Sequence, residues 1–157
     1  MAATIEDRLA ELAIELPDAP APAANYVPFV VTGALVFVSG QVPVWNGEIR
    51  HIGQVGGDLE LEDGIQAARL CGLNLIAQAR AAAGGDLDRI SRVVKLGGFV
   101  NAAPGFTDHP KVVNGASDLM VDVFGDRGRH ARFAVGASTL PLGVAVEVDG
   151  VFELKAS

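Results

Sequence analysis

The spacing of hydrophobic residues along the chain alternates between that of helices and that of strands. Apolar residues recur every three or four positions in three segments, which predicts a helix in each: residues 1–16, 59–83 and 108–126. We expect Thr4 to cap the first helix and Gly84-Gly85 to end the second. Shorter apolar runs between turn residues predict strands elsewhere: residues 29–32, 35–40, 92–102 and two more within 128–154.

This order of elements predicts an α+β fold in which the two longer helices cover one face of a sheet. A proline-rich connector, residues 16–26, joins the first helix to the body. No long linker, low-complexity tract or shift in composition divides the 157 residues. We therefore expect one domain over residues 1–157, of which residues 1–23 are the N-terminal helix and connector.

The last apolar stretch, residues 128–154, is typical of a two-stranded hairpin that carries two opposite charges. With a turn centred on Leu140-Pro141, Arg132 faces Glu147 across the strands. One face is then apolar and the other small or charged, with the sets Phe133, Val135, Val144, Val146, Val148 and Arg132, Ala134, Gly136, Ala145, Glu147, Asp149. The small residues leave room for a ligand or a neighbouring subunit. Taken alone, the pattern favours a surface ion pair worth about 0.2–1 kcal/mol.

Charge and composition narrow the partners and the compartment. The net charge is −7 and no basic patch interrupts it, which argues against a nucleic-acid partner. The single cysteine, Cys71, excludes an internal disulfide and fits a reducing compartment. The charged N-terminus does not fit an export signal, and the longest apolar run, residues 26–38, is too short for a bilayer. We therefore expect a cytoplasmic protein without a membrane partner.

The usual reactive side chains lack the spacing that catalysis or metal binding needs. The three histidines are far apart and show no ligand spacing, so we interpret them as surface or capping residues: His51, His109 and His130. Cys71 lies within a predicted helix, where a thiol packs as a small hydrophobe. Ser39 is not in a nucleophile elbow.

A set of short motifs nevertheless resembles a known family: Tyr26, SGQ at 39–41, Asn114, AR at 131–132 and LPLGVAVEV at 140–148. They resemble the Rid family of reactive-intermediate imine deaminases, also called the YjgF family and formerly L-PSP endoribonucleases. The resemblance covers nearly all of residues 24–154, and fifteen residues separate Tyr26 from Gln41 and Arg132 from Glu147, as in the family. Asn114 and Arg132 are one residue further apart than usual.

The resemblance implies a fold, an assembly and a reaction. The fold is that of the trimeric type of chorismate mutase, a mixed β-sheet with two main helices on one face, here with an extra N-terminal helix. Family members form homotrimers with three clefts, each between two subunits. They hydrolyse short-lived enamines and imines, such as 2-aminoacrylate, to 2-oxo acids and ammonia, and use neither a metal nor an organic cofactor.

The resemblance also implies roles for particular residues. Arg132 offers a planar fork suited to the carboxylate of a 2-imino acid, and Glu147 is placed to deprotonate a water. Backbone N–H groups near Gly40 and Ala134 are expected to hold the other end of the carboxylate. Three further polar residues are expected to line the cleft: Tyr26, Ser39 and Asn114. Without the resemblance, these three would be a strand anchor, a turn residue and a helix-surface residue.

Three hypotheses about function remain open at this point. The first is an imine and enamine deaminase, which needs both Arg132 and Glu147. The second is a non-catalytic trimer that binds a small carboxylate, which needs only Arg132. The third is the endoribonuclease of the older family name, against which the acidic composition argues. The family often has a small residue where this chain has Phe133. The extra N-terminal helix and an insert near residues 108–132 indicate a longer branch of the family, for which the substrate is less firmly implied than the fold.

Overall fold

The structure, a computed structural model, describes residues 2–22 and 24–157. Its elements are α1 (Ile5–Glu11), β1 (Phe29–Thr32), β2 (Leu35–Gln41), β3 (Val44–Trp45), β4 (Glu48–Ile49), α2 (Leu61–Ala82), β5 (Ile90–Asn101), α3 (His109–Phe124), β6 (Ala131–Ala137) and β7 (Val146–Leu154). Short 3₁₀ turns occur at Leu87–Arg89, Gly125–Gly128 and Pro141–Gly143.

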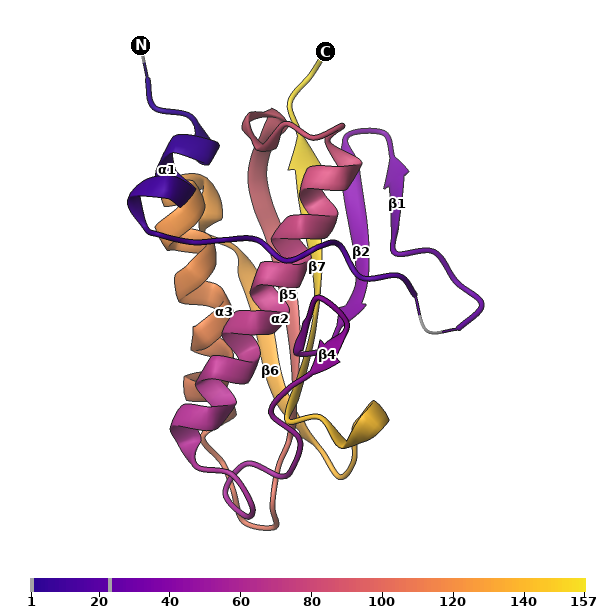
Figure 1. Cartoon of the computed structure of the whole chain (residues 1–157), viewed down its shortest axis with the longest axis vertical. Helices are drawn as coiled ribbons and strands as arrows, with labels where there is room; N and C mark the ends of the chain where they lie inside the picture. Colours follow the sequence, from indigo (N-terminus) through magenta and orange to yellow (C-terminus); the bar gives the residue numbers. More distant parts are fainter. Residues whose placement is uncertain (1, 23) are drawn as a thin grey trace.

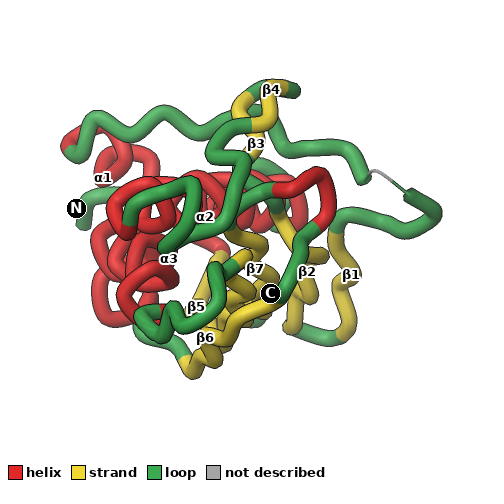
Figure 2. Tube along the Cα trace, turned by 90° about the horizontal axis from the view of Figure 1, so that it is seen from below, coloured by secondary structure: helices red, strands yellow, loops and turns green. Residues whose placement is uncertain are grey.

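Within the described residues, five strands form one mixed sheet in the order β1-β2-β7-β5-β6, and β3 and β4 form a separate ribbon. The helices α2 and α3 lie together on one face of this sheet (Figure 1), and Figure 2 shows the opposite face without a helix. The core lies between the helices and the sheet, where side chains such as Leu75, Leu96 and Phe152 are fully buried. The expected α+β architecture, with two main helices on one face, is confirmed.

Two glycines let α2 and α3 approach closely. A Cβ on Gly72 of α2 would meet the Leu119 side chain at 3.0 Å, and one on Gly115 of α3 would collide with the backbone carbonyl of Ile65. A side chain at position 115 would therefore push the two helix backbones apart, and one at position 72 would crowd Leu119, so packing explains both glycines. Cys71 is fully buried beside them, as expected for a thiol that packs as a hydrophobe.

The N-terminal helix forms where expected but is shorter. Thr4 caps α1 in a capping box with Asp7, which confirms the predicted cap. The helix ends at Glu11, because Ala13 takes a left-handed conformation and the N–H of Ile14 bonds back to the carbonyl of Leu9 at 2.9 Å. The apolar residues that follow pack on the core from an extended chain: Leu12, Ile14 and Leu16.

The chain then crosses the outer face of α2, as Figure 1 shows, before it enters β1. Buried Gln78 of α2 donates a 2.7 Å hydrogen bond to the carbonyl of Pro20, and the N–H of Asp18 donates to Oδ1 of Asn46 at 2.8 Å. Asn46 and Gly47 form a tight turn between β3 and β4, with positive φ at both residues. The proline-rich connector is therefore attached to the body at two points.

The predicted closing hairpin is wrong, since β6 and β7 are not neighbours. β5 lies between them, parallel to β6 and antiparallel to β7, and β7 also pairs with β2. The strands are joined by residues 138–145, a connection long enough to pass the end of β5. Its last part is fixed by non-local hydrogen bonds: the N–H of Ala145 bonds the carbonyl of His51, and Asn101 Nδ2 bonds the carbonyl of Val144.

The predicted division of faces fails for the same reason. On β6, Arg132 pairs with buried Leu96 and lies on the helix-covered side of the sheet. On β7, Glu147 pairs with Phe99, which is 38% exposed on the open face. Arg132 and Glu147 are therefore on opposite faces of one sheet. Their strands are separated by β5, and their partners on β5, Leu96 and Phe99, are three residues apart.

No helix of residues 2–22 or 24–157 combines the length and the apolar composition needed to cross a bilayer.

Candidate functional site

Glu147 lies on the central strand β7 at an irregular point of the sheet. The pairing of β2 with β7 shifts register between Val38 and Gln41, which forms a bulge that contains Gly40. A Cβ on Gly40 would lie 2.6 Å from Oε2 of Glu147, so the carboxylate packs directly against the backbone at Gly40. Gly40 and Glu147, both expected in the site, therefore lie next to each other.

The Glu147 carboxylate is half-buried and has neither a hydrogen-bond donor nor a countercharge among the described residues. Burial, and then the nearby charge of Asp149, raise the pKa of Glu147 above its ordinary value of 4.5. Burial likewise raises the pKa of Asp149. A carboxylate with a raised pKa is a stronger base than a solvated one. Because Glu147 has no donor or countercharge among the described residues, its oxygens are free to bind a proton or a ligand.

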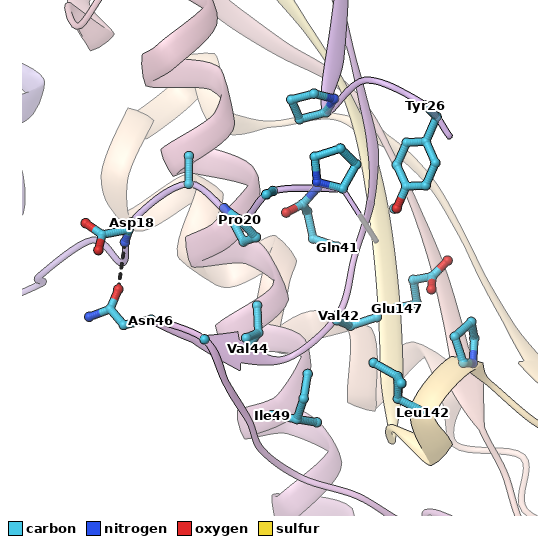
Figure 3. A pocket seen from close by; sticks show the side chains of 17 residues that line it. Asp18, Pro20, Tyr26, Gln41, Val42, Val44, Asn46, Ile49, Leu142 and Glu147 are labelled. Carbon is cyan, nitrogen blue, oxygen red and sulfur yellow. Dashed lines mark hydrogen bonds between the residues drawn. The ribbon is translucent and has the colours of Figure 1, made fainter. Parts of the chain in front are cut away.

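A pocket of about 560 Å³ opens at Glu147. Tyr26 lies at the same end of this pocket as Glu147, whereas Val44 and Ile49 lie toward the other end (Figure 3). Buried Gln41 lines it between the two ends, with its side-chain amide bonded to the carbonyl of Ser39. The structure therefore brings Tyr26, Gly40 and Glu147 to one pocket, and adds Gln41, whose position in the SGQ motif was its only signal in the sequence.

Ser39 has a different position from the one expected. Its Oγ donates to the carbonyl of Val27 at 2.8 Å, and its N–H bonds the carbonyl of Pro28. The side chain is not part of the pocket wall. In the described chain, these two hydrogen bonds from Ser39 therefore hold the segment that follows Tyr26 against β2.

Arg132 lies over α3 and is held by neutral acceptors. Its Nη1 donates to Asn114 Oδ1 at 2.8 Å and to Ser117 Oγ at 3.1 Å, and its Nη2 donates to the Pro110 carbonyl at 3.3 Å. No carboxylate lies within ion-pair distance of it among the described residues. Three of its five N–H groups are thus used, which leaves Nε–H and one N–H of Nη2 for a ligand such as a carboxylate.

A histidine stands behind this contact. His130 Nδ1 lies 2.6 Å from the Gly128 carbonyl and His130 Nε2 lies 2.8 Å from Ser117 Oγ. Because a carbonyl only accepts, Nδ1 carries the proton of the neutral ring, and Nε2 accepts from the Ser117 hydroxyl. Burial, aided by the charge of Arg132, lowers the pKa of His130 although the Gly128 carbonyl opposes this. The neutral ring therefore leaves the Ser117 oxygen to accept from Arg132.

Asn114 and Ala134 both lie on the Arg132 side. Asn114 contacts Arg132 directly, and Ala134 lies two residues along β6 on the same face. The sequence did not indicate Ser117 or His130. Their only signal is that Asn114 and Ser117 are three residues apart on a helix, where side chains share a face.

Among the described residues, no group of three or more His, Cys, Asp or Glu side chains is arranged to hold a metal ion. The candidate site thus has two parts on opposite faces of the sheet, which we call half-sites: the Arg132 guanidinium with Asn114, Ser117 and His130, and the pocket with Tyr26, Gly40, Gln41 and Glu147.

Comparison with known proteins agrees with this fold. The family described as "YjgF/chorismate_mutase-like, putative endoribonuclease" matches residues 6–154. The chain belongs to the YjgF/chorismate mutase-like family. It is 52% identical to "Protein TCP17" of Trypanosoma cruzi over 94% of this chain and 92% of that protein.

Solved structures show the same fold. Protein Atu1372 of Agrobacterium tumefaciens, described as of unknown function, superimposes with a TM-score of 0.90 and 48% identity, over 96% of this chain and 92% of that chain. E. coli TdcF with bound serine superimposes with a TM-score of 0.63 and 25% identity, over 90% of this chain and 97% of that chain. The resemblance that the sequence motifs indicated is confirmed at the level of family and fold.

Proposed function

We propose that the protein hydrolyses reactive 2-imino acids and their enamine tautomers to 2-oxo acids and ammonia. The observation that carries the proposal is the state of its two charges. Arg132 and half-buried Glu147 each lack an opposite charge among the described residues. An anionic substrate with an electrophilic carbon and a water supplies what each of them lacks.

The proposed reaction is a hydrolysis that consumes one water and releases a 2-oxo acid and ammonia. The carboxylate of the imino acid binds the free N–H groups of Arg132, beside backbone N–H groups near Gly40 and Ala134. Glu147 accepts a proton from water as the water oxygen bonds to the imine carbon, and passes that proton to the imine nitrogen, which gives a neutral carbinolamine. Glu147 then accepts the hydroxyl proton and delivers it to the nitrogen as the C–N bond breaks, so that ammonia leaves and the C=O of the 2-oxo acid forms. Tyr26 and Gln41 are placed to orient the reacting groups.

This mechanism requires two copies of the chain. Arg132 and Glu147 are on opposite faces of the sheet, so one copy supplies the guanidinium and another the carboxylate. The open face of the sheet carries exposed apolar side chains suited to such an assembly: Val30, Phe37, Phe99 and Val135. We expect a homotrimer with clefts between subunits, and light scattering that gives a monomer at micromolar concentration would contradict it.

The serine in E. coli TdcF is consistent with a ligand the size of a small amino acid. A bound serine does not distinguish an enzyme from a binding protein, whereas a measurement of turnover does. The direct assay couples an imine-forming amino-acid oxidase to this protein and measures how much semicarbazone a trapping reagent collects. The proposal predicts that catalytic amounts of the protein lower the trapped fraction and that Arg132→Ala does not. An unchanged trapped fraction with the parent protein would contradict the deaminase and leave carboxylate binding as the function.

The ribonuclease in the family description has no support in this chain's charge. A net charge of −7 repels RNA, and scattered cations give no binding stripe. We expect purified protein to leave single-stranded RNA intact at physiological salt. RNA cleavage that persists through purification and is lost in Arg132→Ala would reverse this ranking.

A further inference from the structure

The pocket at Glu147 extends well beyond the residues assigned to the reaction. The reacting end holds Tyr26, Gly40 and Glu147, as Figure 3 shows for Tyr26 and Glu147. The remainder is lined mainly by apolar side chains from four segments, the connector, the chain after β2, the β3–β4 ribbon and the β6–β7 connection: Pro20, Pro22, Val42, Val44, Ile49 and Leu142. We call this part the apolar arm.

The walls of the apolar arm are held in place by buried polar side chains. Gln78, 1% exposed, fixes the connector by its bond to the Pro20 carbonyl. Asn74, fully buried on the same helix, donates to the carbonyls of Val42 and Val44 at 3.2 and 2.8 Å. Hydrogen bonds from buried side-chain amides to these backbone carbonyls hold the walls in fixed positions, so the apolar arm is a preformed cavity.

The size of the cavity does not fit a three-carbon substrate. Pockets of about 300–1,000 Å³ hold ligands of drug size, and this one is about 560 Å³. A substrate such as 2-iminopropanoate, with six non-hydrogen atoms, would occupy the reacting end and leave the apolar walls against water. Apolar walls gain free energy only when an apolar group covers them.

We propose that the apolar arm is a side-chain subsite and that the preferred substrates are 2-imino acids with branched aliphatic or aromatic side chains. The proposal rests on the proposed function for the carboxylate and imine end. The chemistry of the arm adds the side chain: no lysine or arginine lines it, and its one acid, Asp18, is an exposed connector residue beside Asn46.

The test is a ladder of substrates made in situ by an amino-acid oxidase from alanine, norvaline, leucine, phenylalanine and lysine. In a hydrophobic pocket one methylene changes kcat/KM by about 10- to 200-fold. The subsite predicts that the leucine-derived imine exceeds the alanine-derived imine by at least about tenfold, with norvaline between them. Equal values across the ladder, or a lysine-derived imine as the best substrate, would overturn it.

A pair of variants on the β3–β4 ribbon tests the arm itself. Ile49→Trp fills it from the wall, and should lower the leucine-to-alanine ratio of kcat/KM by about tenfold or more. Glu48→Trp adds the same bulk one residue earlier, where the side chain does not line the pocket, and should keep the parental ratio. An unchanged ratio in Ile49→Trp, with circular dichroism like that of the parent, would overturn the subsite.

Binding of stable 2-oxo acids separates failure of the subsite from failure of the proposed function. Calorimetry with pyruvate and 4-methyl-2-oxopentanoate needs no turnover. Tighter binding of the longer acid by about tenfold, lost in Ile49→Trp, supports the subsite even if no imine is hydrolysed, in which case only the proposed function falls. Imine turnover with equal affinity for the two acids and a flat substrate ladder would leave the function standing and remove the subsite.

Discussion

The guanidinium of Arg132 donates hydrogen bonds to three neutral acceptors on α3, whereas the carboxylate of Glu147 accepts none from the described residues. Arg132 is on the edge strand and keeps its charge under all ordinary conditions, while Glu147 is on a central strand with a raised pKa. In the proposed mechanism the first half-site therefore holds a fixed charge in one place, and the second gains and loses a proton.

The difference explains why the two charges are separated within one chain. Had they faced each other, as the hairpin register predicted, they would neutralise each other and leave nothing for a substrate. On opposite faces of the sheet, neither charge neutralises the other, and in the proposed assembly a second copy of the chain completes each site. The following substitutions separate the positioning role proposed for Arg132 from the proton transfer proposed for Glu147.

The largest effect is expected at the positioning half. Arg132→Ala should remove 2-oxo acid binding and imine turnover together, since truncating one partner of a buried charge pair costs about 2–5 kcal/mol. Arg132→Lys should restore little, because an ammonium cannot make a bidentate fork. Calorimetry with pyruvate and the trapping assay measure the two quantities, and loss of turnover with normal binding would show that Arg132 does not hold the carboxylate.

Glu147→Gln should separate turnover from binding. The amide keeps the shape but not the base, so kcat should fall by about 10²- to 10⁴-fold while the affinity for a 2-oxo acid stays close to that of the parent. Single-turnover rates with an oxidase-generated imine measure the deficit. Parental rates in this variant would mean that another group activates the water.

A smaller effect is expected behind the guanidinium. Ser117→Ala removes one of the acceptors of Arg132, so KM should rise about three- to tenfold, equivalent to one hydrogen bond of about 0.5–1.5 kcal/mol, with kcat little changed. Asp118→Ala, at the next and exposed position of α3, is the matched control and should match the parent. A fall in kcat without a rise in KM would assign Ser117 to the chemistry instead of to positioning.

The smallest effect is on stability and depends on pH. The pKa of Glu147 in the folded protein is raised above 4.5, so ionisation disfavours the folded state: the penalty is absent below the unfolded pKa and complete above the folded pKa. Glu147→Gln should therefore raise the free energy of unfolding at pH 7, by less than about 1 kcal/mol because the half-exposed group is screened by solvent. The gain should vanish at pH 4, and urea unfolding at both values measures it. A gain that is equal at the two pH values would contradict the raised pKa.

The sequence predicted the parts of this fold that depend on local spacing. The cap at Thr4 and the end of α2 just before Gly84-Gly85 both follow from residues within a few positions of one another. The partner of β6 does not. It is chosen by the packing of α3 and by the bonds that hold Val144 and Ala145, which connect segments far apart in the chain.

The same limit applies to the site. The family motifs indicated Arg132, Asn114 and Glu147 as site residues, whereas the assumed hairpin register placed the two charges on one face. Ser117 and His130 come together only when α3 packs beside β6, so no local pattern indicated them. The proline-rich connector is evident in the sequence. Its position across α2, however, depends on the hydrogen bond from Gln78, 58 residues further along the chain.

The central claim is that each complete site takes Arg132 from one copy of the chain and Glu147 from another. Mixing inactive Arg132→Ala with inactive Glu147→Gln by unfolding and refolding them together tests it most directly. In a closed ring with sites between neighbours, random assembly of equal amounts gives each site an intact arginine and an intact glutamate in about one case in four. The mixture should therefore recover about a quarter of the parental imine hydrolysis, while each variant refolded alone stays inactive. A mixture that stays as inactive as its components, although the variants are shown to co-assemble, would contradict the two-chain site.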